Sequence, residues 1–370
     1  MSRARTLADQ FNSDGDLALT PVASVNAGQI GGRRNLIING AMQVAQRGAS
    51  ETGVSTSQYA NACDRFKLNG NNGTWTISQD TDAPDGFSNS FKMLLTATET
   101  IGSTSYWAVE QKIEGQNLQG LAYGTSSAET VTLSFYVKSN ITGTYTVNLY
   151  QEDGSLNFPK TYTIDSAGTW ERKTISFAGN TSTALDNDNA SSLRTTFFVV
   201  AGSGVNSGTP GSRVAYSDAT WAAGQSAQVD SVNDYWQITG VQLEVGDTAT
   251  PFEHRSYGDE LASCQRYYYR IGDAGGGFYA TGYISDADDI YFGLSLPCSM
   301  RIDNPTISYA NVVLYTTAGT ETSYTINNFK ASGASLYLNF DSTTSPWTAG
   351  QASSLFVTAN TGFLAADGEL

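Results

Sequence analysis

Residues 235–271 read YWQITGVQLEVGDTATPFEHRSYGDELASCQRYYYRI, and this stretch decides the fold. Apolar residues recur at every second position in its first half, with one slip beside Gly240: Trp236, Ile238, Val241, Leu243 and Val245. This spacing predicts a half-buried β-strand over 235–245 that carries a β-bulge near Gly240. Gly246 and Asp247 end the strand, and Pro251 keeps the following chain extended.

From Gly258 the apolar residues change to steps of three and four, which predicts a short helix. The residues expected on one face of this helix are Leu261, Cys264, Tyr267 and Tyr268. A strand, a turn and a short helix that leads into further strands are typical of a junction between two domains. We therefore predict that these four residues form an interface.

Several motifs give the stretch a resemblance to a known group of proteins. They are the strand and loop VQLE-x-G…TPFE-x-R, the segment E-L-x-x-CQRYY, the run NLIINGAMQVAQRG at Asn35–Gly48, and a terminal FLAADGEL. Together they resemble phage tail-fibre and related virion proteins, in which a jelly roll similar to carbohydrate-binding modules precedes a second β-domain. In that comparison 35–48 would be the opening strand of the jelly roll.

The resemblance implies a homotrimeric fibre or spike on the outside of a phage particle, made in the host cytoplasm. It also implies adhesion to a host cell-surface polysaccharide without catalysis. A capsid-decorating or collar fibre with an assembly role, and a tail adaptor for a separate receptor-binding protein, stay open as alternatives. In a trimer, the four junction residues would pack either between the domains or along the threefold axis.

The predicted organisation is all-β with four parts. Residues 1–33 have too little apolar pattern to fold alone and form an N-terminal extended arm. We expect this arm to anchor the chain to another virion protein, and a floppy tail without a partner is the alternative. Residues 34–256 form a jelly-roll β-sandwich, 257–271 a short junction helix, and 272–370 a C-terminal β-sandwich knob. Alternating strands such as 131–138 and 290–296, separated by turns rich in Gly, Asn and Asp, support both sandwiches.

Composition excludes several classes of partner. The 370-residue chain has a formal net charge of −15, which argues against binding to nucleic-acid phosphates or to an anionic membrane surface. No apolar run is long enough to span a membrane, so we expect no membrane insertion. The three cysteines, Cys63, Cys264 and Cys298, are expected to be free thiols.

No catalytic motif is apparent, and we expect no enzyme activity and no cofactor. The single histidine, His254, lies in a turn without a partner pattern for a catalytic triad. Asp186 and Asp188, in LDNDN, offer oxygen ligands that suit a structural calcium ion, although the full spacing of a calcium loop is missing. The alternative is that both are solvated turn acids.

The predicted binding residues are aromatic, because sugars stack on Tyr and Trp rings while polar neighbours supply hydrogen bonds. In GFYATGYI, Phe278 and Ile284 share parity, so Tyr279 and Tyr283 are expected on the opposite, outward face. The predicted ligand-binding set is Tyr279, Tyr283, Tyr291 and, at a loop tip, Trp347. A subunit interface is an equal alternative for the tyrosines. Four other tryptophans are expected in the core rather than in a binding cleft: Trp75, Trp107, Trp221 and Trp236.

Overall fold

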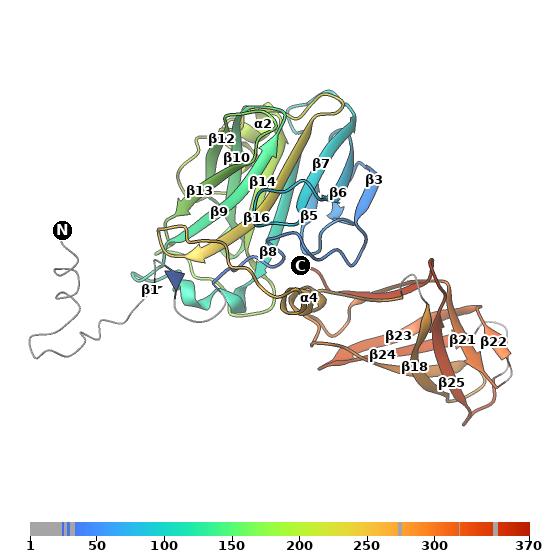
Figure 1. Cartoon of the computed structure of the whole chain (residues 1–370). Coiled ribbons are helices and arrows are strands. Elements are labelled where there is room, and N and C mark those ends of the chain that lie inside the picture. The colour runs from blue at the N-terminus through green and yellow to red at the C-terminus, as the bar shows by residue number, and fades with distance from the viewer. Residues whose placement is uncertain (1–23, 26–27, 30–33, 273–275, 318, 343–346) are drawn as a thin grey trace, which may run out of the picture.

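The computed structural model describes residues 24–25, 28–29, 34–272, 276–317, 319–342 and 347–370. Within them, a larger β-sandwich is followed by one helix and a smaller β-sandwich (Figure 1). The predicted all-β class is confirmed. The predicted arm, 1–33, lies outside the described residues except for β1 (Ser24–Val25) and β2 (Gly28–Gln29), which pair with each other.

The larger domain consists of two antiparallel sheets packed face to face. The first has the order β15 (Val214–Ala215), β11 (Leu156–Asn157), β10 (Gly143–Gln151), β14 (Ser191–Ala201), β8 (Tyr106–Glu114), β5 (Lys67–Gly70) and β4 (Gln58–Tyr59), and β12 (Pro159–Ile164) also pairs with β10. The second has the order β13 (Glu171–Phe177), β9 (Val131–Ser139), β16 (Tyr235–Val245), β7 (Ser90–Ala97), β6 (Thr74–Asp80) and β3 (Ser50–Val54).

The core between these sheets is made by the inward positions of alternating strands. In β9, for example, Val131, Leu133, Phe135 and Val137 are all fully buried in one cluster. Trp75, Trp107 and Trp236 are also fully buried there, as predicted. Burial of such side chains contributes roughly 1.5–3 kcal/mol each, which makes this cluster the main stabilising feature of the domain.

Strand β16 has the bounds and the bulge that the sequence predicts. Its pairing with β9 shifts register between Thr239 and Gln242, around Gly240. Gly240 has φ +61°, and a Cβ atom at this position would lie 2.7 Å from the Phe87 ring. Only glycine fits this bulge without strain.

The segment Asn35–Gly48 is not a strand, so the expectation of an opening strand here is wrong. Asn39 and Met42 have positive φ, which a β-strand cannot accommodate. Side-chain hydrogen bonds of Asn39 hold the segment instead: Nδ2 donates to the carbonyl oxygens of Val44 and Asp64, and Oδ1 accepts from the Val44 amide.

The junction helix is shorter than predicted. Helix α4 spans Tyr257–Gln265, and β17 (Tyr268–Ile271) follows it as a strand. Ser256 caps the helix by accepting a hydrogen bond from the Asp259 amide. The predicted helix over 257–271 is therefore wrong at its end, because the run from Tyr268 pairs with another strand, β26 (Phe363–Asp367).

The remaining helices of the described residues lie in the loops of the larger domain and have three or four residues each. They are η1 (Gly115–Asn117), η2 (Gln119–Leu121), η3 (Glu152–Gly154), α2 (Ser203–Asn206) and α3 (Asp218–Trp221). No helix among the described residues has the length and apolar character needed to cross a membrane.

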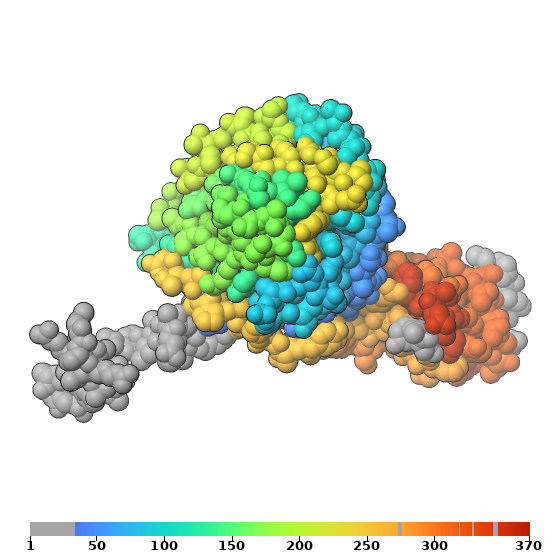
Figure 2. Space-filling model, turned by 45° about the horizontal axis from the view of Figure 1, so that its top comes forward, coloured from blue at the N-terminus to red at the C-terminus, as the bar shows by residue number. Residues whose placement is uncertain are grey.

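The smaller domain also consists of two antiparallel sheets. One has the order β17, β26 and β20 (Thr306–Ala310). The other has the order β22 (Gly319–Glu321), β21 (Val312–Thr316), β25 (Ala352–Val357), β18 (Gly277–Ile284), β19 (Asp289–Ser295), β24 (Ser335–Ser342) and β23 (Tyr324–Ser332). Their inward residues, such as Ile290, Phe292 and Leu338, form a second buried cluster. Figure 2 shows this domain, in orange and red, extending to one side of the larger one.

The two domains are joined in part by polar contacts of the last residue of β26 and the three residues after it, which we call the tail (367–370). Arg47 of the larger domain forms ion pairs with Asp367 at 2.7 Å and with Glu369 at 3.3 Å. Arg65, which is 1% exposed, also pairs with Glu369. The Glu369 carboxylate thus lies between two cations of the other domain, whereas Asp367 pairs with Arg47 alone.

Candidate functional site

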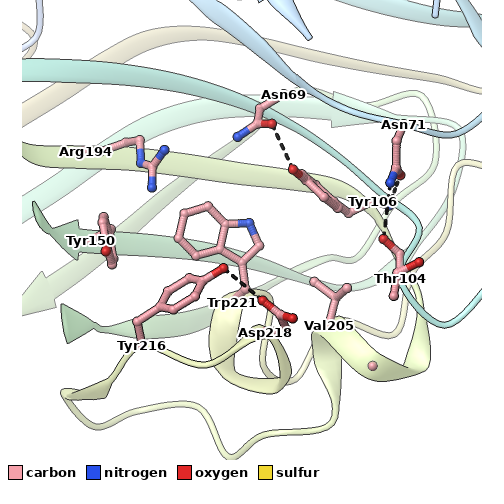
Figure 3. Close-up of a pocket in the computed structure, with 11 residues that line it drawn as sticks. Asn69, Asn71, Thr104, Tyr106, Tyr150, Arg194, Val205, Tyr216, Asp218 and Trp221 are labelled. Atoms are coloured by element: carbon pink, nitrogen blue, oxygen red, sulfur yellow. Dashed lines mark hydrogen bonds between the residues drawn. The ribbon is translucent and has the colours of Figure 1, made fainter. Parts of the chain in front are cut away.

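A hollow of about 570 Å³ lies on the outer face of the eight-stranded sheet, and we call it the outer pocket (Figure 3). Its lining comes from segments far apart in the sequence: Asn69, Asn71, Thr104, Tyr106, Tyr150, Arg194, Gly204, Val205, Tyr216, Asp218 and Trp221. The volume is within the usual range of small-ligand pockets.

The segment that carries α2 and α3 forms one wall of the outer pocket. Ser217 and Thr220 make a capping box at the start of α3, which fixes this four-residue helix. Asp218 occupies the first turn, where a carboxylate is favoured by the helix dipole. Trp221 ends the helix and packs, 6% exposed, in a small apolar cluster with Phe198 and Val205 on this side of the sheet.

Three of the aromatic rings that line the outer pocket contact one another edge to face. Tyr150 and Tyr216 each contact Trp221 edge to face, with ring centres 5.4 and 5.5 Å away, and they lie 5.8 Å from each other. Tyr216 is 46% exposed, so a large part of this ring is available to a ligand. Such a corner of rings provides apolar surfaces of defined shape.

Arg194 lies on the sheet beside these rings. Its guanidinium carbon is 4.8 Å from the Tyr150 ring centre and 4.6 Å from that of Trp221. Glu110 and Glu152 are its ion-pair partners, at 3.4 and 3.6 Å. Its Nε atom is buried without a hydrogen-bond partner. Arg194 therefore supports the aromatic wall, and its charge is already offset by two carboxylates.

The opposite wall carries hydrogen-bonding groups. Asn69 accepts a hydrogen bond from the Tyr106 hydroxyl at 2.9 Å, and Asn71 donates to the Thr104 carbonyl at 3.5 Å, which is a weak bond (Figure 3).

The Tyr216 hydroxyl donates to Asp218 at 2.9 Å. Partial burial, reinforced by this bond and by the Asp218 charge, raises the pKa of Tyr216 to about 12, so the hydroxyl stays protonated.

Sequence reasoning missed the outer pocket because it assigned Trp221 to the core. The tryptophan is indeed nearly buried, but one side of it contributes to the pocket lining. The available signal was the spacing Tyr216-x-Asp218-x-x-Trp221 inside a segment that has no strand alternation. Such an aromatic and acidic cluster in a loop is typical of binding sites.

Two of the predicted ligand-binding tyrosines lie together on the outer face of the smaller domain. Tyr283, which is 58% exposed, stacks on Tyr291 with ring centres 5.4 Å apart. Tyr337, on β24, continues this row at 5.6 Å from Tyr291.

Tyr279 does not join them. A bulge between Phe278 and Ala280 exchanges the two faces of β18, so Tyr279 packs against the core while Phe278 is 65% exposed. The predicted parity is therefore wrong at Tyr279, because a bulge adds one residue and inverts the alternation.

Trp347 was expected at an exposed loop tip, and this expectation is wrong. Its side chain is 5% exposed and belongs to the apolar core of the smaller domain. Its amide donates a hydrogen bond to the Ala287 carbonyl at 3.0 Å. Trp347 is thus a core residue whose ring is unavailable to a ligand.

The two predicted metal ligands lie in an exposed loop, where each residue makes a hydrogen bond within the protein. Asp188 Oδ1 accepts a hydrogen bond from the Ala190 amide, and the Asp186 amide donates to Asp153. Among the residues that the structure describes, no group of three acidic, histidine or cysteine side chains has the arrangement of a metal site.

The predicted interface residues lie at the junction between the domains within one chain. Cys264, Tyr267 and Tyr268 are buried, whereas Leu261 is half-buried. Tyr267 lies under the Arg65 guanidinium and Tyr268 under that of Arg47, at 3.4 and 3.7 Å. Burial raises the pKa of the Cys264 thiol, which keeps it protonated.

The single histidine packs in an aromatic cluster on the six-stranded sheet. The ring centres of Phe87 and Phe252 lie 5.3 and 5.0 Å from that of His254. These rings line a second hollow of about 510 Å³ together with Tyr136 and Arg172.

No family model matches the sequence, and no curated protein matches it. Among solved structures, the chain is similar to the enzymatically active domain of tailspike protein 4 of bacteriophage CBA120, at 13% identity and a TM-score of 0.32. That match covers 57% of this chain and 21% of the tailspike, so this chain spans about a fifth of the tailspike's length.

Two further similar structures are complete modules. One is a putative sugar-binding protein from Bacteroides thetaiotaomicron, with 12% identity, a TM-score of 0.32, and coverage of 57% of this chain and 100% of that one. The other is the family 11 carbohydrate-binding module of Clostridium thermocellum in complex with a mixed-linked tetrasaccharide, with 12% identity, a TM-score of 0.25, and coverage of 55% and 99%. The sequence identity and the TM-score are low in all three comparisons, so the fold assignment depends on the sheet topology described above.

Proposed function

We propose that this chain is a non-catalytic carbohydrate-binding protein and that the outer pocket is its binding site. The observation that carries the proposal is the corner formed by Tyr150, Tyr216 and Trp221 opposite the polar groups of Asn69 and Asn71. Sugars have apolar CH faces, which pack on aromatic rings, and hydroxyl groups, which bond to amides and carboxylates. The outer pocket offers both kinds of contact within one hollow.

The charges favour an uncharged sugar over an acidic one. Among the residues that the structure describes, Arg194 is the one cation that lines the outer pocket, and Glu110 and Glu152 already pair with it. Asp218 adds a carboxylate at the same site. An acidic sugar would therefore meet negative charge without a free cation to balance it.

The same lining supports binding without hydrolysis. Asp218 is the one carboxylate among the described residues that line the outer pocket. Glycoside hydrolysis generally needs two carboxyl groups that flank the scissile bond.

A role on a virion is the finer part of the proposal and is supported by the motifs at 235–271. In it, a homotrimeric fibre or spike is made in the host cytoplasm and displayed on the outside of a phage particle. There it adheres to a host-surface polysaccharide, and residues 1–33 attach it to another virion protein. A phage that produces only the shortened chain starting at Asn35 is expected to assemble particles without this protein, and normal incorporation of the shortened chain would contradict the proposed attachment.

The binding proposal is tested by titrating the full chain with neutral and uronic-acid-containing oligosaccharides while Trp fluorescence is recorded. A neutral oligosaccharide should bind, and Tyr216→Ala should weaken binding by about 2- to 12-fold, which corresponds to roughly 0.5–1.5 kcal/mol for one aromatic contact. Tyr257→Ala is the matched control, because Tyr257 is 57% exposed on α4, outside the outer pocket. Equal affinity in the wild type and Tyr216→Ala would contradict the assignment of the site.

A further inference from the structure

The outer face of the seven-stranded sheet in the smaller domain carries two groups of aromatic residues, which we call the aromatic face. One group is the row Tyr283, Tyr291 and Tyr337, and the other is Phe278, Tyr315 and Phe356. These side chains alternate with the core residues of five neighbouring strands, β21, β25, β18, β19 and β24. The two groups thus lie on the same face of one sheet, with the smaller side chains of Thr281 and Ser354 between them.

The geometry of the rings argues against a sugar as the occupant. In the tyrosine row the rings are 25° and 30° from parallel and 5.4 and 5.6 Å apart, so each face of Tyr291 is covered by a neighbouring ring. Tyr291 therefore presents only its ring edge and hydroxyl group, whereas a sugar needs an open ring face. In the other group, the Phe278 ring contacts Phe356 and Tyr315, and the rest of this ring is exposed.

Charge is depleted on the part of this surface formed by β18, β21 and β25, although the chain as a whole is acidic. These three strands contain no Asp, Glu, Lys or Arg, in a chain of net charge −15, whereas β19 and β24 place Asp289 and Asp341 beside the tyrosine row. Two copies of such a chain repel each other over most surfaces, and the uncharged part of the aromatic face is where they can meet. Aromatic enrichment with few charges is also the composition of the centre of protein–protein interfaces.

The size of the aromatic face fits a specific contact between copies. Five strands about 4.8 Å apart, each with roughly six residues at about 3.3 Å, cover about 500 Å² per chain. Two such faces bury about 1,000 Å², the lower bound of specific protein interfaces. Phe278 and Tyr283, 65% and 58% exposed, would supply much of the apolar part.

We propose that the aromatic face is covered by a second copy of this chain, so that the protein is a homo-oligomer assembled through its smaller domain. The inference rests on the homo-oligomeric part of the proposed function and assigns its contact surface. It does not depend on the carbohydrate site, which lies in the other domain and uses other residues.

The test is the molar mass of the full chain in solution, measured by light scattering after size exclusion at about 10–100 µM. The wild type is expected at a multiple of the chain mass, and a Phe278→Asp/Tyr283→Asp double variant at the mass of one chain. Tyr257→Asp is the control, since it adds one charge at an exposed tyrosine outside the aromatic face, and it should keep the wild-type mass. Tyr315→Asp gives an independent second variant, and thermal melting checks that every variant is folded.

Three results would overturn the inference. They are a monomeric wild type, an unchanged mass in both folded aromatic-face variants, and equal dissociation of the Tyr257→Asp control. If the double variant stays oligomeric but loses oligosaccharide binding, the aromatic face binds sugar and both proposals are wrong about their sites. Loss of binding in Tyr216→Ala alone leaves the homo-oligomer proposal unaffected.

Discussion

The guanidinium of Arg65 lies between the Tyr267 ring, 3.4 Å away, and the carboxylate of Glu369. Arg65 is 1% exposed and Glu369 is buried, so neither charge has water as an alternative partner. Glu369→Gln leaves a buried cation without its carboxylate and should lower the free energy of unfolding by about 3–5 kcal/mol. Urea denaturation of the full chain measures this loss.

The control for this prediction is a surface ion pair. Lys173 pairs with Asp165, whose side chain is 71% exposed, so Asp165→Asn should cost less than about 1 kcal/mol. Similar losses in the two variants would show that the Arg65–Glu369 pair has no special role.

Trp347→Ala should destabilise the smaller domain by about 3–5 kcal/mol, because it leaves a cavity in the apolar core. Binding of oligosaccharide by the folded variant should equal that of the wild type. Thermal melting measures the stability of the variant, and titration with oligosaccharide measures its binding. A stable variant with weakened binding would restore Trp347 as a ligand contact.

Gly240→Ala should destabilise the chain by more than about 1 kcal/mol, since its Cβ would meet Phe87 and its φ of +61° disfavours other residues. Gly258→Ala is the matched control. No atom lies within 4 Å of a Cβ at Gly258, which is inside α4, so alanine should stabilise by about 0.5–1 kcal/mol. Denaturation experiments should therefore show a lower free energy of unfolding for Gly240→Ala and a higher one for Gly258→Ala.

Acid should weaken the junction through Glu114, which accepts two hydrogen bonds of 2.8 Å from Arg266. Burial by itself raises the pKa of Glu114, but the hydrogen bonds from Arg266 and Tyr267 outweigh it and hold this pKa below its ordinary value. A lowered pKa in the folded state means that the stabilisation is complete above the ordinary carboxyl pKa of about 4.3 and is lost as the pH falls below it. The wild type should therefore lose more stability than Glu114→Gln between pH 6 and pH 3, as measured by urea denaturation. A constant difference between the two proteins over this range would contradict the assignment.

The sequence predicts elements whose period is undisturbed or whose irregularity is marked by a glycine. Strand β16 is the best example, because Gly240 marks the bulge and the apolar residues on either side keep their period. The bulge in β18 has no such mark, since Phe278 and Tyr279 are both large aromatic residues. A pattern argument cannot locate a bulge between two residues of the same type, so the faces were assigned wrongly there.

The outer pocket could not be predicted because its walls meet only through tertiary structure. Tyr150 and Arg194 face each other across two paired strands, whereas Trp221 reaches them from a capped turn in a loop. Likewise, the burial of Trp347 depends on distant strands that close over it. Periodicity identifies which face of a strand is apolar, but it does not show what packs against that face.

The tail has one further consequence for how the molecule would act. Besides the passage of the chain through α4 (Figure 1), the smaller domain contacts the larger one where Glu369 returns to Arg65 and Arg47 and where Arg301 and Asn189 exchange hydrogen bonds. A hinge motion at α4 would have to break these contacts, so we expect the direction of the outer pocket relative to the aromatic face to vary little. In an oligomer built through that face, the pockets would stand at a constant spacing. A repeating polymer could then engage several of them together, with an avidity far above the affinity of one site.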